Sequence, residues 1–352
     1  MELNNIIFSS ILIFIGYFFN KYILVFLNKS KFNLLTDDQF QKPQAFHEKP
    51  THRLGGVIIF SLLSLVFLYL YFFKKVFIFE YLSFCTFFFL LGLIDDLKLN
   101  IPPKFRLIIM CAFLIILIIS NNLYIQRTGL EFLDNLLVID IFSLIFVGLC
   151  FLFIINGSNL IDGFNGLLGI HSLIIFIILF SINLINDNLD LAYILFYIAL
   201  LILIFLKFNF PKAQIFLGDS GAYLIGVLIA VSVINTSVVN FSVSPFFFCI
   251  LLFYLFFEVF FSFFRKLFFV RQSPLLPDKA HLHMSLYKFL RKKNNKKLEA
   301  NYKVSIYLNS IYMLLITPGI IFMNDGLFCR YYFFFLLAVY IYFYKKLYEM
   351  AK

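Results

Sequence analysis

Residues 137–186 read LVIDIFSLIFVGLCFLFIINGSNLIDGFNGLLGIHSLIIFIILFSINLIN, which is two long apolar runs joined by a short polar stretch. The runs near 137–155 and 167–186 are each long enough to cross a hydrocarbon core of about 30 Å as a helix. The polar stretch between them, 156–166, contains three Asn, three Gly and one Asp but neither Lys nor Arg. This pattern predicts membrane-spanning helices joined by a connection that carries chemistry.

The rest of the chain has the same character. Of its 352 residues, 62% are hydrophobic and only 14% are charged, whereas soluble domains have about 25% charged residues. The composition therefore excludes water-soluble and disordered classes and predicts an all-α polytopic membrane protein with one domain, 1–352. The five cysteines lie in or beside apolar runs without a C-x-x-C pair, and we interpret them as small hydrophobic residues.

We predict eleven transmembrane helices, and each coincides with an apolar run. They lie near 5–27, 55–73, 77–94, 105–120, 137–155, 167–186, 189–208, 220–236, 243–263, 304–323 and 330–348.

Charge sets the expected orientation. Most Lys and Arg residues lie in alternate connections, above all in a basic loop at about 264–303. The positive-inside rule places these connections in the cytoplasm, with the N-terminus outside and the C-terminus inside. Lipid headgroups and topology explain the net charge of +10, so we expect no nucleic-acid partner.

Polar residues gather on that predicted cytoplasmic side in five clusters. The first, residues 47–56, combines basic side chains such as Arg53 with Gly55 and Gly56 before the second run. Basic groups can meet an anion, and glycines permit close approach of a phosphate or of another chain. A topology signal is the simpler interpretation of this cluster taken alone.

The second cluster, residues 92–106, places Asp95 and Asp96 at the end of an apolar run, followed by Lys98, two prolines and Lys104. Carboxylates at a membrane edge need a partner such as a divalent cation or a cationic side chain. Paired acids are also suited to deprotonating a substrate. Helix termination explains these residues equally well.

The third cluster is the stretch 156–166, in which Asn amides can bind a base, a sugar hydroxyl or an acetamido group. The fourth, residues 208–222, places Asp219 between glycines at the expected start of a helix, where it can hold Mg²⁺ beside phosphate oxygens. A tight turn and a helix cap are the structural alternatives for these two clusters.

The fifth cluster, residues 273–283, ends with His281 and His283. We expect an extended segment in which both imidazoles lie on one side and can bind a phosphate or a sugar. A zinc pair is the alternative, although no other Cys or His lies nearby in the sequence. His171, within the sixth run, is expected to be a packing residue.

Taken in order, the clusters resemble the motifs of the polyprenyl-phosphate N-acetylhexosamine-1-phosphate transferases, the WecA/TagO/MraY superfamily of glycosyltransferase family 4. Asp95 to Arg106 resembles the family's Asp-Asp segment that ends in Pro-Pro-Lys, and Asn156 to Gly166 its Asn-x-x-Asn-x-x-Asp-Gly-x-Asn-Gly loop. Phe208 to Gly226 is similar to its Phe-Asn…Gly-Asp-x-Gly segment. Pro277 to His283 resembles the Pro-Asp-Arg-x-His-Leu-His-His signature of the WecA-like branch, although Met284 ends the histidine run one residue short.

The resemblance implies transfer of an N-acetylhexosamine 1-phosphate, GlcNAc-like, from a UDP-sugar to undecaprenyl or another polyprenyl phosphate, with release of UMP. The expected setting is the cytoplasmic face of the plasma membrane, at the first membrane step of cell-surface polysaccharide or cell-wall glycan synthesis. Mg²⁺ is the implied cofactor, with Mn²⁺ as an alternative, and a homodimer is known among relatives.

The resemblance also implies roles for single residues. Asp219 would bind the metal, Asp95 would contact and deprotonate the lipid phosphate, and Asp96 would position the metal or a lysine. Asp162 completes the catalytic set. The implied substrate-binding residues are Arg53, Lys98, Lys104, Asn159, Asn165, His281 and His283.

Two other functions are considered. A phospho-MurNAc-pentapeptide transferase is the alternative within the family, and Asn165 argues against it because that branch tends to have Asp there. A polytopic transporter is the alternative from another class, and it predicts ionisable residues lining a path through the spans. The main acidic candidates, Glu80, Asp140 and Glu258, are scattered.

Overall fold

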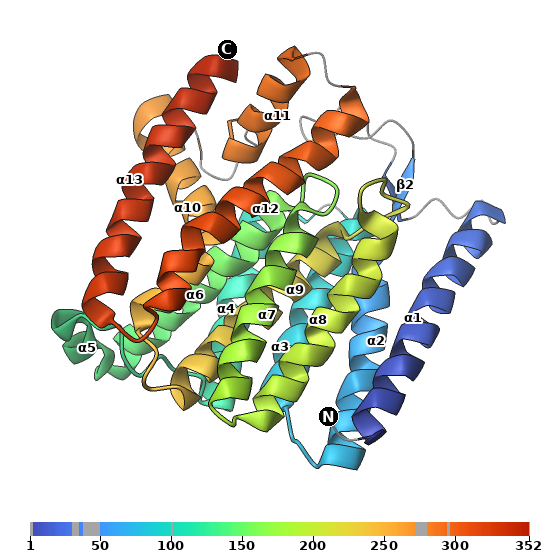
Figure 1. Cartoon of the computed structure of the whole chain (residues 1–352), viewed down its shortest axis with the longest axis horizontal. Helices are drawn as coiled ribbons and strands as arrows, with labels where there is room; N and C mark the ends of the chain where they lie inside the picture. Colours follow the sequence, from blue (N-terminus) through green and yellow to red (C-terminus); the bar gives the residue numbers. More distant parts are fainter. Residues whose placement is uncertain are drawn as a thin grey trace.

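The computed structural model of the chain describes residues 3–29, 35–37, 50–99, 101–271, 273, 280–293 and 296–351. Within these ranges ten helices are long and apolar enough to cross a membrane. The chain is therefore an all-α polytopic membrane protein, as predicted (Figure 1). Its helices are α1 (Leu3–Lys29), α2 (Gly55–Tyr69), α3 (Phe79–Asp96), α4 (Pro103–Asn121), α5 (Glu131–Leu137), α6 (Asp140–Ile161), α7 (Leu167–Ile185), α8 (Leu189–Asn209), α9 (Gly218–Val239), α10 (Pro245–Phe264), α11 (Leu282–Lys292), α12 (Lys297–Ile321) and α13 (Gly326–Ala351), with π-helical turns at Leu70–Lys74 and Arg265–Val270.

Each of the eleven predicted runs coincides with a helix. The one outside the ten is α3, whose 18 residues include Glu80, Asp95 and Asp96. Two short helices, α5 and α11, were not predicted. The predicted boundaries differ most at two places. α6 continues to Ile161, so the connection before α7 is shorter than the predicted stretch 156–166. α12 begins at Lys297, within the predicted basic loop 264–303.

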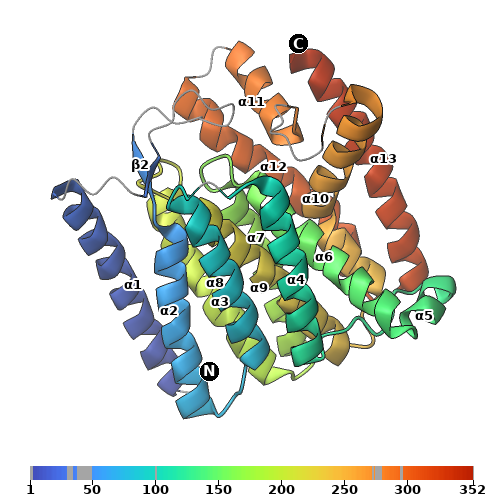
Figure 2. The same cartoon turned by 180° about the vertical axis from the view of Figure 1, so that it is seen from behind.

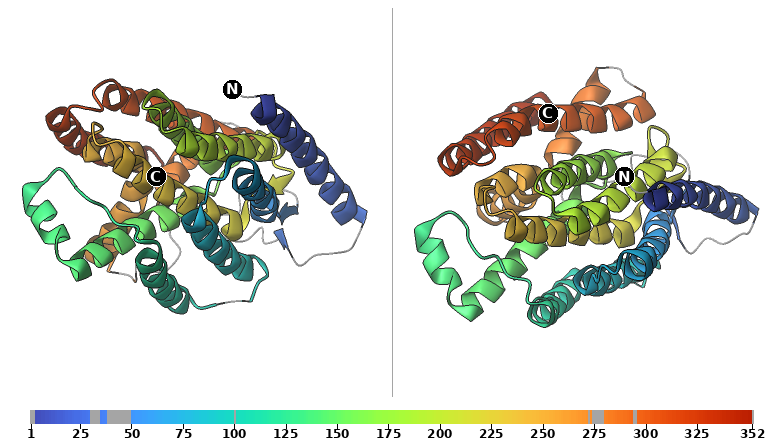
Figure 3. Two further views of the ribbon diagram at one scale, coloured as in Figure 1. Left: turned by 90° about the horizontal axis from the view of Figure 1, so that it is seen from below. Right: turned by 60° about the horizontal axis from the view of Figure 1, so that its bottom comes forward.

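Helix α9 lies at the centre of the bundle, where it contacts α2, α3, α6 and α7. Figures 1 and 2 show it enclosed from both sides, with α1 and α13 at opposite edges. Views turned about the horizontal axis show the same arrangement (Figure 3). Most side chains of α9 are buried, including small ones such as Ser220, Ala222 and Ser232. Small residues allow helices to pack closely where water supplies no driving force between them.

A small sheet covers the end of the bundle that also carries α11 (Figure 1). Its strands are β1 (Thr36–Asp37), β2 (Thr51–Arg53) and β3 (Ile215–Phe216). β2 pairs antiparallel with β1 and parallel with β3, with Arg53 opposite Phe216. The sequence reasoning predicted no strand here. The pairing brings the first polar cluster beside the segment that leads into α9.

Glycines at this end let two helices hold the start of α9. A Cβ on Gly92 of α3 would lie 2.5 Å from the Asp219 carbonyl oxygen, and a Cβ on Gly56 of α2 would lie 2.3 Å from the Gly221 nitrogen. Both neighbours are backbone atoms, which cannot rotate away. Gly56 therefore serves the close approach of another helix, one of the two uses expected for it.

Replacing Gly92 with Ala should lower the free energy of unfolding by about 1–3 kcal/mol, because the added methyl group forces α3 away from α9. Gly148→Ala on α6 is the matched control, since the nearest atom to its Cβ would be Ile118 Cδ1 at 4.0 Å. Denaturation of both variants in detergent measures the difference. Equal stability of the two variants would contradict the tight α3–α9 contact.

Candidate functional site

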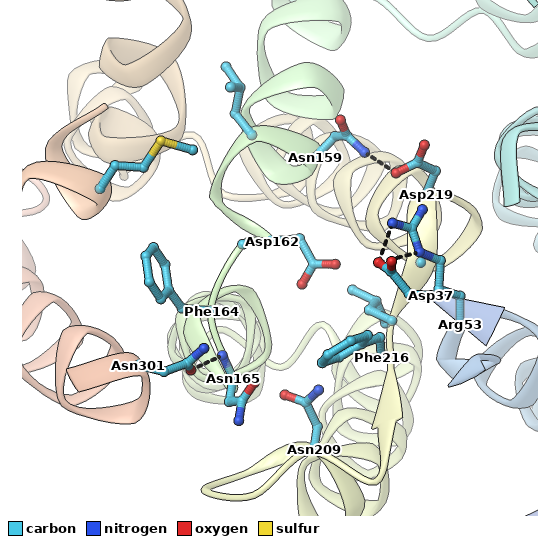
Figure 4. Close-up of a pocket in the computed structure, with 15 residues that line it drawn as sticks. Asp37, Arg53, Asn159, Asp162, Phe164, Asn165, Asn209, Phe216, Asp219 and Asn301 are labelled. Carbon is cyan, nitrogen blue, oxygen red and sulfur yellow. Dashed lines mark hydrogen bonds and ion pairs between the residues drawn. The ribbon is translucent and has the colours of Figure 1, made fainter. Parts of the chain in front are cut away.

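A cavity of about 150 Å³ opens at the sheet-covered end of the bundle. It lies where the C-terminal end of α6, the start of α9, β2 and α12 meet (Figure 4). Most of its polar side chains come from the predicted clusters. The lining residues are Asp37, Arg53, Asn159, Leu160, Asp162, Gly163, Phe164, Asn165, Asn209, Phe216, Leu217, Gly218, Asp219, Met284 and Asn301.

Asp219 faces this cavity from the first turn of α9. Its Oδ1 accepts a hydrogen bond from Asn159 Nδ2 at 3.0 Å, which joins the third and fourth clusters. Gly218 precedes it with φ +77°, a conformation that favours glycine. Packing of α6 against α9 thus brings together two motifs that lie far apart in the sequence.

Asp96 does not line the cavity, because it caps α9 from the neighbouring helix. Its Oδ1 accepts the backbone N–H of Asp219 at 2.9 Å, and its Oδ2 accepts the backbone N–H and the hydroxyl of Ser220 at 2.9 and 2.7 Å. A buried carboxylate is stabilised by such donors, and it compensates the positive end of the helix. The backbone N–H groups of Asp219 and Ser220 are therefore occupied by Asp96.

Asp162 lines the cavity just after the end of α6, and its carboxylate points toward the side where Asp219 and Arg53 lie (Figure 4). Within the described residues it accepts no hydrogen bond. Burial and the negative charge of Asp219 raise the pKa of the Asp162 carboxyl well above its usual range, against the opposing effect of Arg53. A cation between the two carboxylates would favour the ionised form of both.

Arg53 reaches the cavity from β2. Its Nη2 lies 2.6 Å from Asp37 Oδ2, and its Nη1 lies 3.7 Å from Asp96 Oδ1. The guanidinium is the one lining cation among the described residues, and it stands beside the acidic groups of α3 and α9. Arg53 thus lies at the same cavity as residues of the third and fourth clusters, whereas residues 47–49 of its own cluster lie outside the described residues.

The turn that carries Asn165 is fixed by amide side chains. Asn165 Nδ2 donates to the Pro211 carbonyl at 2.9 Å, and its backbone N–H donates to Asn301 Oδ1 at 2.9 Å. Asn209 Oδ1 accepts the Gly166 N–H at 2.7 Å. Asn165 therefore lines the cavity while its amide nitrogen is engaged by the protein.

The first acid of the Asp-Asp pair faces another partner. Asp95 Oδ2 lies 2.6 Å from Nη1 of Arg106 in the first turn of α4, and neither residue lines the cavity. Lys98 and Lys104 are exposed beyond it, also outside the lining. The structure thus brings Arg53, Asn159, Asp162, Asn165 and Asp219 to one cavity and places Asp95, Lys98 and Lys104 beside it.

The two histidines lie behind the cavity wall. His281 and His283 are buried, and their rings stack in parallel with centroids 5.3 Å apart. The expected extended segment was wrong, because α11 begins at Leu282 and contains His283. Burial lowers the pKa of His283 to about 4, so this imidazole is neutral at pH 7. The preceding residues 274–279 of the cluster lie outside the described residues.

Sequence reasoning missed several residues that shape the site. Arg106 was part of a quoted motif without a role, and Asp37, Asn209 and Asn301 were not singled out as site residues. A signal existed for α12: Asn301, Ser305 and Asn309 recur every four residues and hydrogen-bond to residues 165–171. That stripe includes the contact of Asn309 with His171, which is a buried packing residue as expected.

The described residues contain no group of three or more His, Cys, Asp or Glu side chains that could enclose a metal ion. Mg²⁺ commonly uses one or two carboxylates together with substrate phosphates and water. Asp162 and Asp219 supply hard oxygen donors of this kind on one cavity. The donor set therefore fits a magnesium ion shared with a phosphorylated substrate.

Comparisons with known proteins give concordant matches. Residues 78–237, from α3 through most of α9, match the family described as Glycosyl transferase family 4. The undecaprenyl-phosphate alpha-N-acetylglucosaminyl 1-phosphate transferase of Thermotoga maritima is 29% identical over 274 residues, which cover 76% of this chain and 77% of that protein.

Relatives of a second kind match as well. The phospho-N-acetylmuramoyl-pentapeptide-transferase of Prochlorococcus marinus is 30% identical over 335 residues, 87% of this chain and 90% of that protein. The Dictyoglomus turgidum protein of the same name is 36% identical over 197 residues, 54% of this chain and 61% of that protein.

Proposed function

Because this chain belongs to glycosyl transferase family 4, we propose that it transfers an N-acetylhexosamine 1-phosphate from a UDP-sugar to undecaprenyl phosphate or another polyprenyl phosphate. The products are polyprenyl-diphospho-sugar and UMP. The relatives named above include an enzyme that carries N-acetylglucosaminyl 1-phosphate in its name. The proposed site lies on the cytoplasmic face of the cell membrane, with the N-terminus outside, in agreement with the positive-inside rule.

One observation carries the proposal: Asp162, Asp219, Asn159 and Arg53 line one polar cavity at the end of a bundle of apolar helices. A reaction between a lipid phosphate and a water-soluble nucleotide sugar needs such a boundary. The lipid tail stays among the helices while both phosphates meet the polar residues. A transporter would instead need ionisable residues along a path through the spans.

The chemistry requires charge neutralisation because an anionic oxygen of the lipid phosphate attacks the β-phosphorus of an anionic nucleotide. Asp219, assisted by Asp162, would hold the magnesium ion, which supplies Lewis-acid stabilisation of phosphate oxygens. Manganese would fit the same oxygen donors. Arg53 would contact the diphosphate, and no protein nucleophile is needed.

The lipid phosphate is proposed to arrive beside α3 and α4. Asp95 lies there with Arg106, and the exposed Lys98 and Lys104 carry positive charge at the same edge. The three cations would attract the phosphate. Asp95, released from Arg106 as the guanidinium turns to the phosphate, would then accept its proton. Asp96 would act through Asp219, whose backbone it holds.

The nucleotide sugar is proposed to occupy the side of the cavity formed by α6, α12 and β3. Asn159 and Asn165 offer their amide oxygens, since their amide nitrogens donate to Asp219 and Pro211. Phe164 and Phe216 offer aromatic faces for a base or sugar ring. His281 and His283 lie behind Phe164, and they would contact the sugar or phosphate once the Phe164 ring is displaced. The simple N-acetylhexosamine is favoured over MurNAc-pentapeptide by Asn165 and by the His-Leu-His sequence.

Transfer can be measured with purified protein in nanodiscs, given undecaprenyl phosphate, Mg²⁺ and UDP-N-acetylglucosamine with tritium in the sugar. We expect lipid-extractable label that disappears with EDTA and returns with Mg²⁺ or Mn²⁺. UDP-N-acetylgalactosamine and UDP-MurNAc-pentapeptide in parallel identify the preferred sugar. Absence of lipid-extractable label with all three donors would contradict the proposed reaction.

A further inference from the structure

A buried acid in the middle of α10 has no role in the proposed chemistry. Glu258 is 1% exposed and lies among aromatic residues of α10 and α13. In the sequence Glu258 is one of three scattered acidic candidates for a transporter path. Its position on a membrane-spanning helix makes it costly unless its oxygens find donors.

Both oxygens of Glu258 are engaged by the segment that opens α11. Oε2 lies 2.9 Å from Nδ1 of His281, and Oε1 accepts the backbone N–H of Leu282 at 3.1 Å. Oε1 also lies 4.0 Å from Nδ1 of His283. One carboxylate therefore fixes the first turn of α11 and the orientation of the His281 ring.

The start of α11 in turn forms part of the cavity wall. Met284 lines the cavity, and the His283 ring meets the ring of Phe164, another lining residue, edge-on with centroids 5.8 Å apart. His283 Nε2 is buried without a hydrogen-bond partner in the described part of the chain. An unpaired imidazole nitrogen next to a cavity wall is available to a ligand that displaces the phenyl ring.

We propose that Glu258 is a positioning residue, which holds His281 in the tautomer protonated at Nδ1 and aligns His283 and Met284 with the nucleotide-sugar side of the cavity. The proposal rests on the proposed function, because it assigns the histidines to the nucleotide sugar. A hydrogen-bonded carboxylate commonly fixes the tautomer and ring orientation of a functional histidine. Glu258 acts through these residues and does not touch the reacting atoms.

Steady-state kinetics of Glu258→Gln test this role, with Glu258→Asp as the conservative variant. Glu80→Gln is the matched control: Glu80 also lies on a long apolar helix and accepts one hydrogen bond, from Asn235, but it does not line the cavity. We expect kcat/KM for the UDP-sugar to fall about 10–100-fold in Glu258→Gln. The KM for undecaprenyl phosphate should stay unchanged, Glu258→Asp should recover part of the loss, and Glu80→Gln should behave as the unmodified protein.

A double variant separates positioning from general support of the fold. If Glu258 acts through His281, then Glu258→Gln combined with His281→Gln should lose no more than the more damaging single change. Multiplied losses, or a rise in both KM values together with a lower melting temperature, would overturn the positioning role. So would wild-type kinetics in Glu258→Gln.

Nitrogen-15 NMR of histidine-labelled protein gives a readout that does not depend on turnover. The chain has five histidines, so the signals are few. The Nδ1-protonated signal of His281, assigned by its loss in His281→Gln, should shift in Glu258→Gln and persist in Glu80→Gln. An unchanged spectrum would overturn the proposal. If the wild-type protein transfers no sugar phosphate, the proposed function fails, whereas the spectra still decide whether Glu258 orients His281.

Discussion

Replacing Asp219 with Asn should lower kcat by about 10³-fold and leave the melting temperature within about 2 °C of the original. The amide keeps the shape of the side chain at the start of α9, but it removes the negative charge that would hold a divalent cation against the phosphates. The hydrogen bonds that hold this end of α9 use the backbone of Asp219 and are preserved. The nanodisc transfer assay and a thermal unfolding curve measure both quantities.

Asp187→Asn is the matched control for that variant. Asp187 is exposed in the turn between α7 and α8, and its φ of 57° suits Asn. The transfer activity of Asp187→Asn should equal that of the wild-type protein. If Asp219→Asn keeps activity within tenfold of the wild type, this carboxylate does not hold the cation.

Replacing Asp96 with Ala should reduce both stability and activity. The change leaves the N–H groups of Asp219 and Ser220 and the Ser220 hydroxyl without their acceptor, and each buried orphaned group costs about 1–3 kcal/mol. The loss of the cap should also shift Asp219 away from the cavity. We therefore expect a lower melting temperature and a loss of turnover of at least about 10²-fold.

Asp95→Ala is the comparison that separates the two neighbouring acids. Asp95 pairs with Arg106, and their side chains are 9% and 27% exposed. Removing the carboxylate leaves the guanidinium with access to water, so the cost to stability is small. Asp95→Ala should therefore lower turnover with little change in melting temperature. Equal destabilisation by the two substitutions would contradict the capping role of Asp96.

The helices were predictable because a membrane span needs a long apolar run, and the candidate site was predictable because its polar residues interrupt those runs. The different contacts of Asp95 and Asp96 could not be predicted from the sequence. Successive residues on a helix point about 100° apart, so one carboxylate meets α9 and the other meets α4. Which one does so depends on packing between helices far apart in the sequence.

The histidines show a second limit of the sequence. Their polar character suggested direct contact with substrate, yet both are buried against Glu258, a residue of another helix. The extended segment was wrong because that carboxylate supplies an acceptor for the first N–H of α11. Likewise, strands of two or three residues such as β1–β3 have too little periodicity to be recognised in the sequence, and they form only where the fold brings distant segments together.

Labelled phosphorus shows which phosphate of the nucleotide sugar moves to the lipid. UDP-N-acetylglucosamine labelled with ³²P at either the α or the β position is supplied to the nanodisc protein with undecaprenyl phosphate and Mg²⁺. We expect β-label to enter the lipid phase while α-label remains in water as UMP. Retention of both labels in water, or β-label released as UDP while the sugar alone moves to lipid, would contradict attack at the β-phosphorus.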